Sequence, residues 1–160
     1  MTQTLDLANV REFLTRHFID VFDTMLSMKV AVAPKIEVPH VGDRVSGSVG
    51  FAGENMNGVL YIHLSAPFAK QVAASMLGVT LEEIADEHEV NDVIGEVTNM
   101  VTGGLKSWMC DIGTECAMST PAIIRGSSFS IEPMPEVQRD WLVFDCGTEK
   151  AIVEIHLKLN

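Results

Sequence analysis

The chain has 160 residues, of which 47% are hydrophobic, and a formal net charge of −11. Its length and apolar content fit one globular domain over residues 1–160 and exclude a disordered chain. The acidic charge excludes a nucleic-acid partner, since phosphate binding needs clustered Lys and Arg, and it would repel an anionic membrane surface.

No apolar run reaches the roughly 18 residues needed to cross a bilayer. The N-terminus carries neither the basic start nor the apolar stretch of a signal peptide, so we expect a cytoplasmic protein. The three cysteines, Cys110, Cys116 and Cys146, have no CxxC spacing and no His in a zinc-like pattern. We therefore interpret them as buried free thiols.

The first predicted element is a long amphipathic helix from about Leu5 to Ser27. Its apolar residues recur at helical spacing, whereas its other face mixes charges of both signs. The stretch Val30–Val38 then alternates as a strand does. Pro34 and Pro39 indicate that this strand lies at a sheet edge or ends there.

A β-hairpin is predicted next, from Arg44–Phe51 and Val59–Leu64, because the connection between them is rich in Gly and Asn. A short helix over Ala66–Leu77 follows. Ser65 is suited to cap its start, and Gly78 is suited to end it.

The central predicted element is a helix over Glu89–Lys106. Steps of 100° per residue place an apolar stripe on one side of it. The opposite stripe carries or adjoins Asp92, Gly95, Glu96, Asn99 and Gly103. Polar residues of this kind also occur on any solvated helix face. The glycines favour a functional surface instead, because each costs a helix about 1 kcal/mol relative to Ala and leaves room for the backbone of another protein.

After this helix we predict short strands at about Glu115–Met118 and Ser127–Ile131, with Pro121 between them ending or interrupting the pairing. A second hairpin, formed by Trp141–Cys146 and Ala151–Leu159, completes the chain.

The two predicted hairpins resemble each other. Phe51 precedes His63 by twelve residues, as Phe144 precedes His156, and both histidines lie in an Ile-His-Leu triplet. We infer a duplicated helix-plus-β-hairpin unit. The fold class is α+β, with one antiparallel sheet, a pseudo-twofold axis and long helices packed on one face. The two histidines are predicted as strand residues on a half-exposed face.

No familiar catalytic motif is complete in the sequence. Gly103–Ser107 lacks the spacing of a phosphate loop, His88–Asp92 lacks the second His of a zinc protease, and no nucleophile elbow is present. This leaves the acid and amide of the central helix, Glu96 and Asn99. A carboxamide does not titrate near neutral pH, so it can orient a water but cannot act as a general base. Orientation is what phosphoryl hydrolysis through a loose transition state most needs.

The pattern Asp92-x-x-x-Glu96-x-x-Asn99, followed by Pro121, resembles the signature of the CheC/CheX/FliY family of chemotaxis phosphatases. Twenty-one residues separate Asn99 from Pro121, one fewer than in the family pattern. A single copy of the motif is most similar to the CheX branch. The duplicated fold also agrees, so the likeness covers essentially the whole chain.

The resemblance implies a protein phosphatase that hydrolyses the aspartyl phosphate of a CheY-like response regulator in two-component signalling. Asn99 would position the attacking water and Glu96 would pair with a regulator lysine. Asp92 and Pro121 would be supporting residues, together with Gly95 and Gly103, which the helix face already indicated.

The resemblance also implies that Mg²⁺ belongs to the regulator, that this chain holds no metal or cofactor, and that it forms a homodimer. The main alternative is a non-catalytic adaptor domain of the same fold, as in flagellar switch proteins. A small-molecule hydrolase ranks last, because the sequence offers no set of nucleophile, base or metal ligands.

Overall fold

The computed structural model describes residues 3–34 and 42–160. The elements, in chain order, are α1 (Leu7–Leu26), β1 (Ala31–Val32), β2 (Arg44–Gly53), β3 (Met56–Ser65), α2 (Ala66–Leu77), the short 3-10 helix η1 (Leu81–Glu83), α3 (Glu87–Asp111), β4 (Cys116–Met118), β5 (Ala122–Gly126), β6 (Gln138–Cys146) and β7 (Glu149–Leu159).

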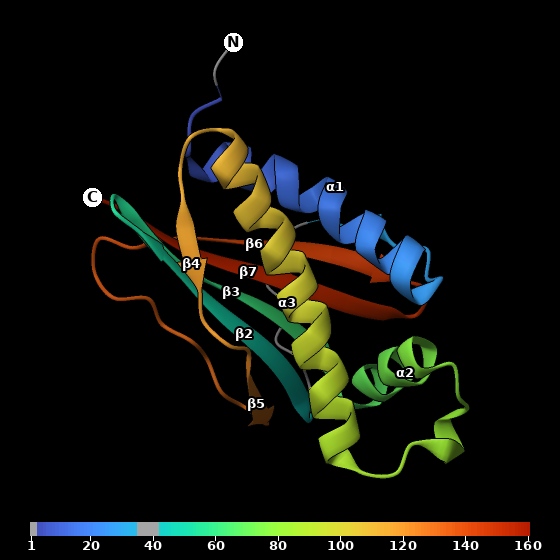
Figure 1. Cartoon of the computed structure of the whole chain (residues 1–160). Helices are drawn as coiled ribbons and strands as arrows, with labels where there is room; N and C mark the ends of the chain where they lie inside the picture. The colour runs from blue at the N-terminus through green and yellow to red at the C-terminus, as the bar shows by residue number, and fades with distance from the viewer. Residues whose placement is uncertain (1–2, 35–41) are drawn as a thin grey trace.

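Within the described residues, the strands form one seven-stranded sheet in which every pair is antiparallel. Its order is β1-β6-β7-β3-β2-β4, and β5 pairs with β2 next to β4. Helices α1 and α3 lie across the same face, and α2 packs against α3 near the start of that helix (Figure 1). The predicted α+β class, with long helices on one face, is confirmed.

The two hairpins repeat each other in register. Phe51 pairs with Gly58 in the first hairpin, and Phe144 pairs with Ala151 in the second. Phe144 follows Phe51 by 93 residues, and Ala151 follows Gly58 by the same interval. The same interval separates His63 from His156. Each half also lends strands to the other, because β1 pairs with β6 whereas β4 and β5 pair with β2. This arrangement supports the duplicated unit inferred from the sequence.

The helix boundaries follow from capping side chains. The carboxylate of Asp6 accepts a hydrogen bond from the Asn9 backbone N at 2.8 Å, so α1 begins just after it. Asp86 accepts from the Glu89 backbone N at 3.1 Å in the same way, so α3 begins two residues earlier than predicted. The predicted apolar stripe of α3 is buried in the core throughout: Val90, Ile94, Val97, Val101 and Leu105.

Two strand predictions need correction. The predicted strand Val30–Val38 is a strand only at Ala31–Val32, and its later part lies outside the described residues. The strand predicted at Ser127–Ile131 is wrong, and the pairing with β2 is made by Ala122–Gly126 instead. Ser128 has a φ of 56°, a left-handed conformation that ends the strand. The Phe129 carbonyl that follows accepts a hydrogen bond from Arg44 at 2.9 Å.

Helix α3 packs closely on the sheet where it crosses β2. A Cβ atom added to Gly47 would lie 2.0 Å from Oγ1 of Thr98, closer than any real contact. Thr98 is wholly buried, and its hydroxyl donates to the Ile94 carbonyl at 2.7 Å, so it cannot turn away without losing that bond. Glycine at this position therefore sets how near α3 lies to the sheet.

This contact predicts a position-specific effect on stability. Gly47→Ala should lower the free energy of unfolding by about 1–3 kcal/mol, because the new methyl group overpacks the contact between α3 and β2. Gly50→Ala on the same strand is the matched control, since its Cβ would lie 3.5 Å from its nearest neighbour, Oγ of Ser119. Urea denaturation of both variants checks this, and equal losses would show that the close approach is not limiting.

Candidate functional site

The predicted polar stripe lies on the outer side of α3. Asp92 and Glu96 are exposed, and Asn99 and Gly103 are half-buried. Among the described residues, none makes a hydrogen bond or ion pair with the side chains of Asp92, Glu96 or Asn99. A Cβ atom added to Gly103 would meet nothing within 4 Å. The acid and the amide thus point outward together from one helix.

Pro121 lies beside this stripe although it is distant in sequence. It stands between β4 and β5, so the predicted interruption of pairing at Pro121 agrees with the structure. A Cβ atom added to Gly95 would lie 3.7 Å from Cβ and 3.8 Å from Cγ of Pro121. The side of Gly95 that the sequence suggested was open to a partner is therefore covered by Pro121 of the same chain. Gly103 is the glycine that leaves open space.

This arrangement suits the binding and orientation of groups on another molecule. The carboxamide of Asn99 can donate and accept hydrogen bonds, and the carboxylate of Glu96 can pair with a cation. Both side chains project from a helix whose inner stripe is buried, so their Cα and Cβ atoms are held in fixed positions. Because no described residue engages them, binding a partner need not first break an internal contact.

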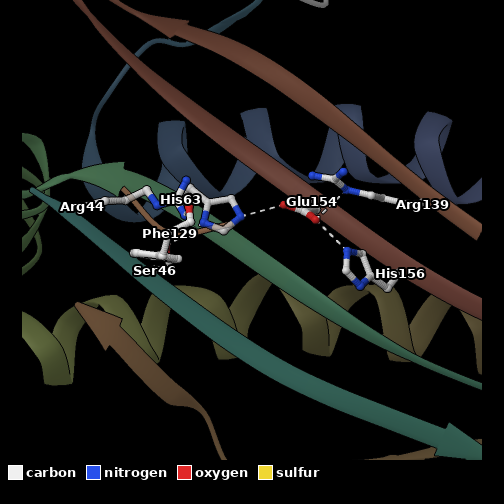
Figure 2. Close-up of polar contacts among 7 residues, drawn as sticks. All are labelled: Arg44, Ser46, His63, Phe129, Arg139, Glu154 and His156. Carbon is white, nitrogen blue, oxygen red and sulfur yellow. Dashed lines mark hydrogen bonds and ion pairs between the residues drawn. The ribbon is translucent and has the colours of Figure 1, made fainter. Parts of the chain in front are cut away.

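A second polar cluster lies on the opposite face of the sheet, with the helices behind (Figure 2). Oγ of Ser46 is 2.6 Å from Nδ1 of His63, and Nε2 of His63 is 3.0 Å from Oε1 of Glu154. Glu154 also accepts hydrogen bonds from Nε2 of His156 at 2.6 Å and Nε of Arg139 at 2.8 Å. We call these five residues the Glu154 cluster.

The histidine prediction was wrong about exposure. His63 and His156 do occupy matched strand positions, but they are only 2% and 6% exposed. The segment 127–137, which runs from β5 to β6, packs on this face. Phe129 lies against the Arg44 guanidinium, and Val137 lines a small pocket together with His156. The alternation of apolar and polar residues along the strands predicted that this face of the sheet is half-exposed. A segment without regular structure covers it instead.

The charges of the Glu154 cluster follow from burial and hydrogen bonding. Burial alone would raise the pKa of Glu154, but the hydrogen bonds from His63, His156 and Arg139 outweigh it and lower the pKa to about 2. Burial lowers the pKa of His63. A neutral His63 then donates to the Glu154 carboxylate and accepts from the Ser46 hydroxyl.

Ser46, His63 and Glu154 are the residue types of a hydrolytic triad, but Ser46 has no exposed surface, so a substrate cannot reach its hydroxyl. We assign the cluster a structural role. The sequence offered only a partial signal for it, since the two matched histidines were evident and their shared acid was not.

The three cysteines are free, as predicted, but the prediction that they are buried is wrong. Cys110 is exposed, and Cys116 and Cys146 are half-buried. Cys110 follows Asp92 by about five helix turns, so it lies on the same outer stripe of α3.

In the part of the chain that the structure describes, no helix could span a membrane. Within residues 3–34 and 42–160, no three His, Cys, Asp or Glu side chains are grouped to hold a metal ion.

Comparisons with known proteins give the family and the fold of the chain. A sequence model of the family described as chemotaxis phosphatase CheX matches residues 45–145. The chain is similar to the solved structure of the chemotaxis protein CheX from Vibrio vulnificus, with 28% identity, 97% of this chain and 100% of that chain covered, and a TM-score of 0.80. It is equally similar to a CheC-like superfamily protein from Shewanella sp. PV-4, with 28% identity, coverage of 96% and 99%, and a TM-score of 0.80.

A more distant likeness is to the CheX–CheY–BeF3–Mg²⁺ complex from Borrelia burgdorferi. The identity is 20%, the coverage is 93% of this chain and 97% of that chain, and the TM-score is 0.74. The comparison with curated protein sequences gives no significant match.

The Glu154 cluster predicts loss of stability in acid. As pH falls through 6.5, the unfolded chain protonates His63 before the folded one does, and as pH falls from 4.5 towards 2 the same holds for Glu154. Both steps lower the free energy of unfolding, the second by about 3 kcal/mol in total.

Denaturation measured across this pH range checks the prediction. Glu154→Gln should make the dependence below pH 4.5 shallower, whereas Glu12→Gln on the exposed side of α1 should leave it unchanged. An unchanged slope in Glu154→Gln would contradict the assigned charge state.

Proposed function

Because the chain belongs to the chemotaxis phosphatase CheX family, we propose that it dephosphorylates the aspartyl phosphate of a CheY-like response regulator. The observation that carries the proposal is the outward pair on α3. Glu96 and Asn99 project from one rigid helix with no partner among the described residues. The related complex from Borrelia burgdorferi contains CheX and CheY, which supports the class of partner.

In the proposed reaction, α3 docks with Asn99 over the phosphorylated pocket of the regulator. The carboxamide holds a water in line with the phosphorus–oxygen bond to the aspartyl group. The water oxygen bonds to phosphorus as that bond breaks, which releases inorganic phosphate and the free aspartate. Positioning supplies the rate gain, since a loose transition state demands little of a general base.

The other site residues set the register of docking. Glu96 pairs with a regulator lysine beside the phosphate, and Asp92, one turn earlier, helps to orient the regulator. Gly103 lets the regulator's backbone approach α3, while Pro121 on Gly95 forms the side of the docking surface. Mg²⁺ in this scheme is held by the regulator, so no cofactor is assigned to the chain.

The proposal extends to assembly and location. The described part of the sheet ends in β1 on one side and in β4 and β5 on the other. Such edges can pair with a second copy, and we propose a homodimer. A cytoplasmic location is part of the same proposal.

The first test of this function is removal of the amide. Asn99→Ala should lower phosphate release from a phosphorylated CheY-like regulator with Mg²⁺ by about 100-fold, as expected when a preorganised hydrogen-bonding group is lost from a transition state. Glu96→Ala should weaken docking and also slow release.

Glu12→Ala is the control for that test, because it removes an exposed glutamate from α1. An unchanged rate in Asn99→Ala would refute the mechanism. Binding of the regulator without turnover by the unmodified protein would favour the adaptor alternative.

A second prediction separates stability from activity at Gly103. Gly103→Ala should raise the free energy of unfolding by about 1 kcal/mol, because alanine favours the helix and its methyl group meets nothing. It should nevertheless lower phosphatase activity by about tenfold, because the methyl group would stand where the regulator approaches. Ser107→Ala, one turn further along α3, is the control, and full activity in Gly103→Ala would place the docking surface elsewhere.

A further inference from the structure

The corner between β4 and β5, residues 119–121, is held firmly to β2. The backbone N of Ser119 donates to the Gly50 carbonyl at 2.8 Å, and Ala122 pairs with Ser48. These bonds fix Pro121 relative to the sheet. They do not by themselves fix it relative to α3, the helix that carries Glu96 and Asn99.

Arg125 makes the connection to α3. It pairs with Val45, whose side chain is buried under the helices, so Arg125 projects from the helix-covered face of the sheet. Its Nε donates to Oδ1 of Asn91 at 2.6 Å, and a terminal nitrogen donates to the Glu87 carbonyl at 3.4 Å. The guanidinium also lies 3.9 Å from the Glu87 carboxylate.

Helix α3 and this part of the sheet run in antiparallel order. Asn91 bonds to Arg125, and four residues later Gly95 faces Pro121, which precedes Arg125 by four residues. Only an added Cβ atom at Gly95 would come within van der Waals contact of Pro121, so the packing at Gly95 does not set the register of Pro121 along the helix. The directional hydrogen bond between Arg125 and Asn91 supplies that register.

We propose that Arg125 is a positioning residue of the phosphatase site, which holds Pro121 against the Gly95 turn of α3 and so shapes the docking surface beside Glu96 and Asn99. The inference rests on the proposed function. Asn91 is its acceptor. Arg125 itself lies behind the surface that meets the regulator and touches neither phosphate nor water.

The position of Arg125 suggests which kinetic constant it controls. Glu96 and Asn99 keep their places on α3 when Arg125 is lost, since the inner stripe of the helix stays buried. Loss of Arg125 instead releases β5 from the first turns of α3, so that the gap between the helix and Pro121 changes. Docking should therefore weaken while the chemical step in the docked complex is largely preserved. The ion pair with Glu87 adds little, because the Glu87 side chain is 79% exposed.

The test is steady-state phosphate release from a phosphorylated CheY-like regulator with Mg²⁺. Arg125→Ala and Asn91→Ala should each raise KM by about tenfold with kcat within about twofold of the unmodified protein, and the double variant should be no worse than either single one. Asn91→Asp keeps the acceptor oxygen and should retain a normal KM. Arg16→Ala, an exposed arginine on α1, is the control.

The outcomes are distinguishable. An active protein whose KM is unchanged in Arg125→Ala, or whose Asn91→Asp variant is as impaired as Asn91→Ala, overturns this inference and leaves the proposed function standing. An unmodified protein that releases no phosphate overturns the proposed function, and this inference with it. A loss of kcat equal to that of Asn99→Ala would also refute a role in positioning the docking surface.

Discussion

The site depends on how closely α3 lies on the sheet. At Gly47 there is no room for even a methyl group beneath Thr98, and the buried stripe of the helix continues in both directions from that point. Where α3 crosses β2, the outer stripe is thereby restricted in height and rotation, because a helix turned about its axis would bring Thr98 into β2. For chemistry that rests on orientation, this rigidity matters more than any shifted pKa. In the proposed mechanism, a carboxamide on a loop would meet the phosphate in many poses, of which few are productive.

The opposite face of the sheet complements this arrangement. Glu154 on β7 joins His63 on β3 and Arg139 on β6, so three adjacent strands share one buried carboxylate. Segment 127–137, which packs over that face, continues directly from β5, the strand that carries Arg125. Segment 127–137 covers one face of the sheet, and the corner at residues 119–121 lies beside the candidate site on the other face. The two segments are joined only by β5. The polar network and the docking surface are therefore linked by chain connectivity, although they lie on opposite sides of the sheet.

The spacing of apolar residues predicted the helices, which local sequence determines. It did not predict features that depend on contacts between distant segments. The helices were evident because their apolar stripes and capping residues, such as Ser65, are local. The outward position of Glu96 followed from the same spacing. The strand at Ala122–Gly126 was missed, since it is short and bounded by Pro121 and Gly126, while the false strand nearby fails at the left-handed Ser128. The burial of His63 depends on a covering segment more than sixty residues away, and no pattern within its own strand reports it. Pro121 faces Gly95 for an equally non-local reason, the pairing of β4 and β5 with β2.

The exchange of strands between the two halves has a consequence for how such a chain can change over time. Because β1 completes the second half and β4 and β5 complete the first, each half is an unfinished structure by itself. Both halves contribute strands to the shared sheet, whereas the outer surfaces of α1 and α3 each come from one half. The outer surface of one helix can therefore change without harm to the other, and α1 with its mixed charges differs in this way from α3 with its acid and amide.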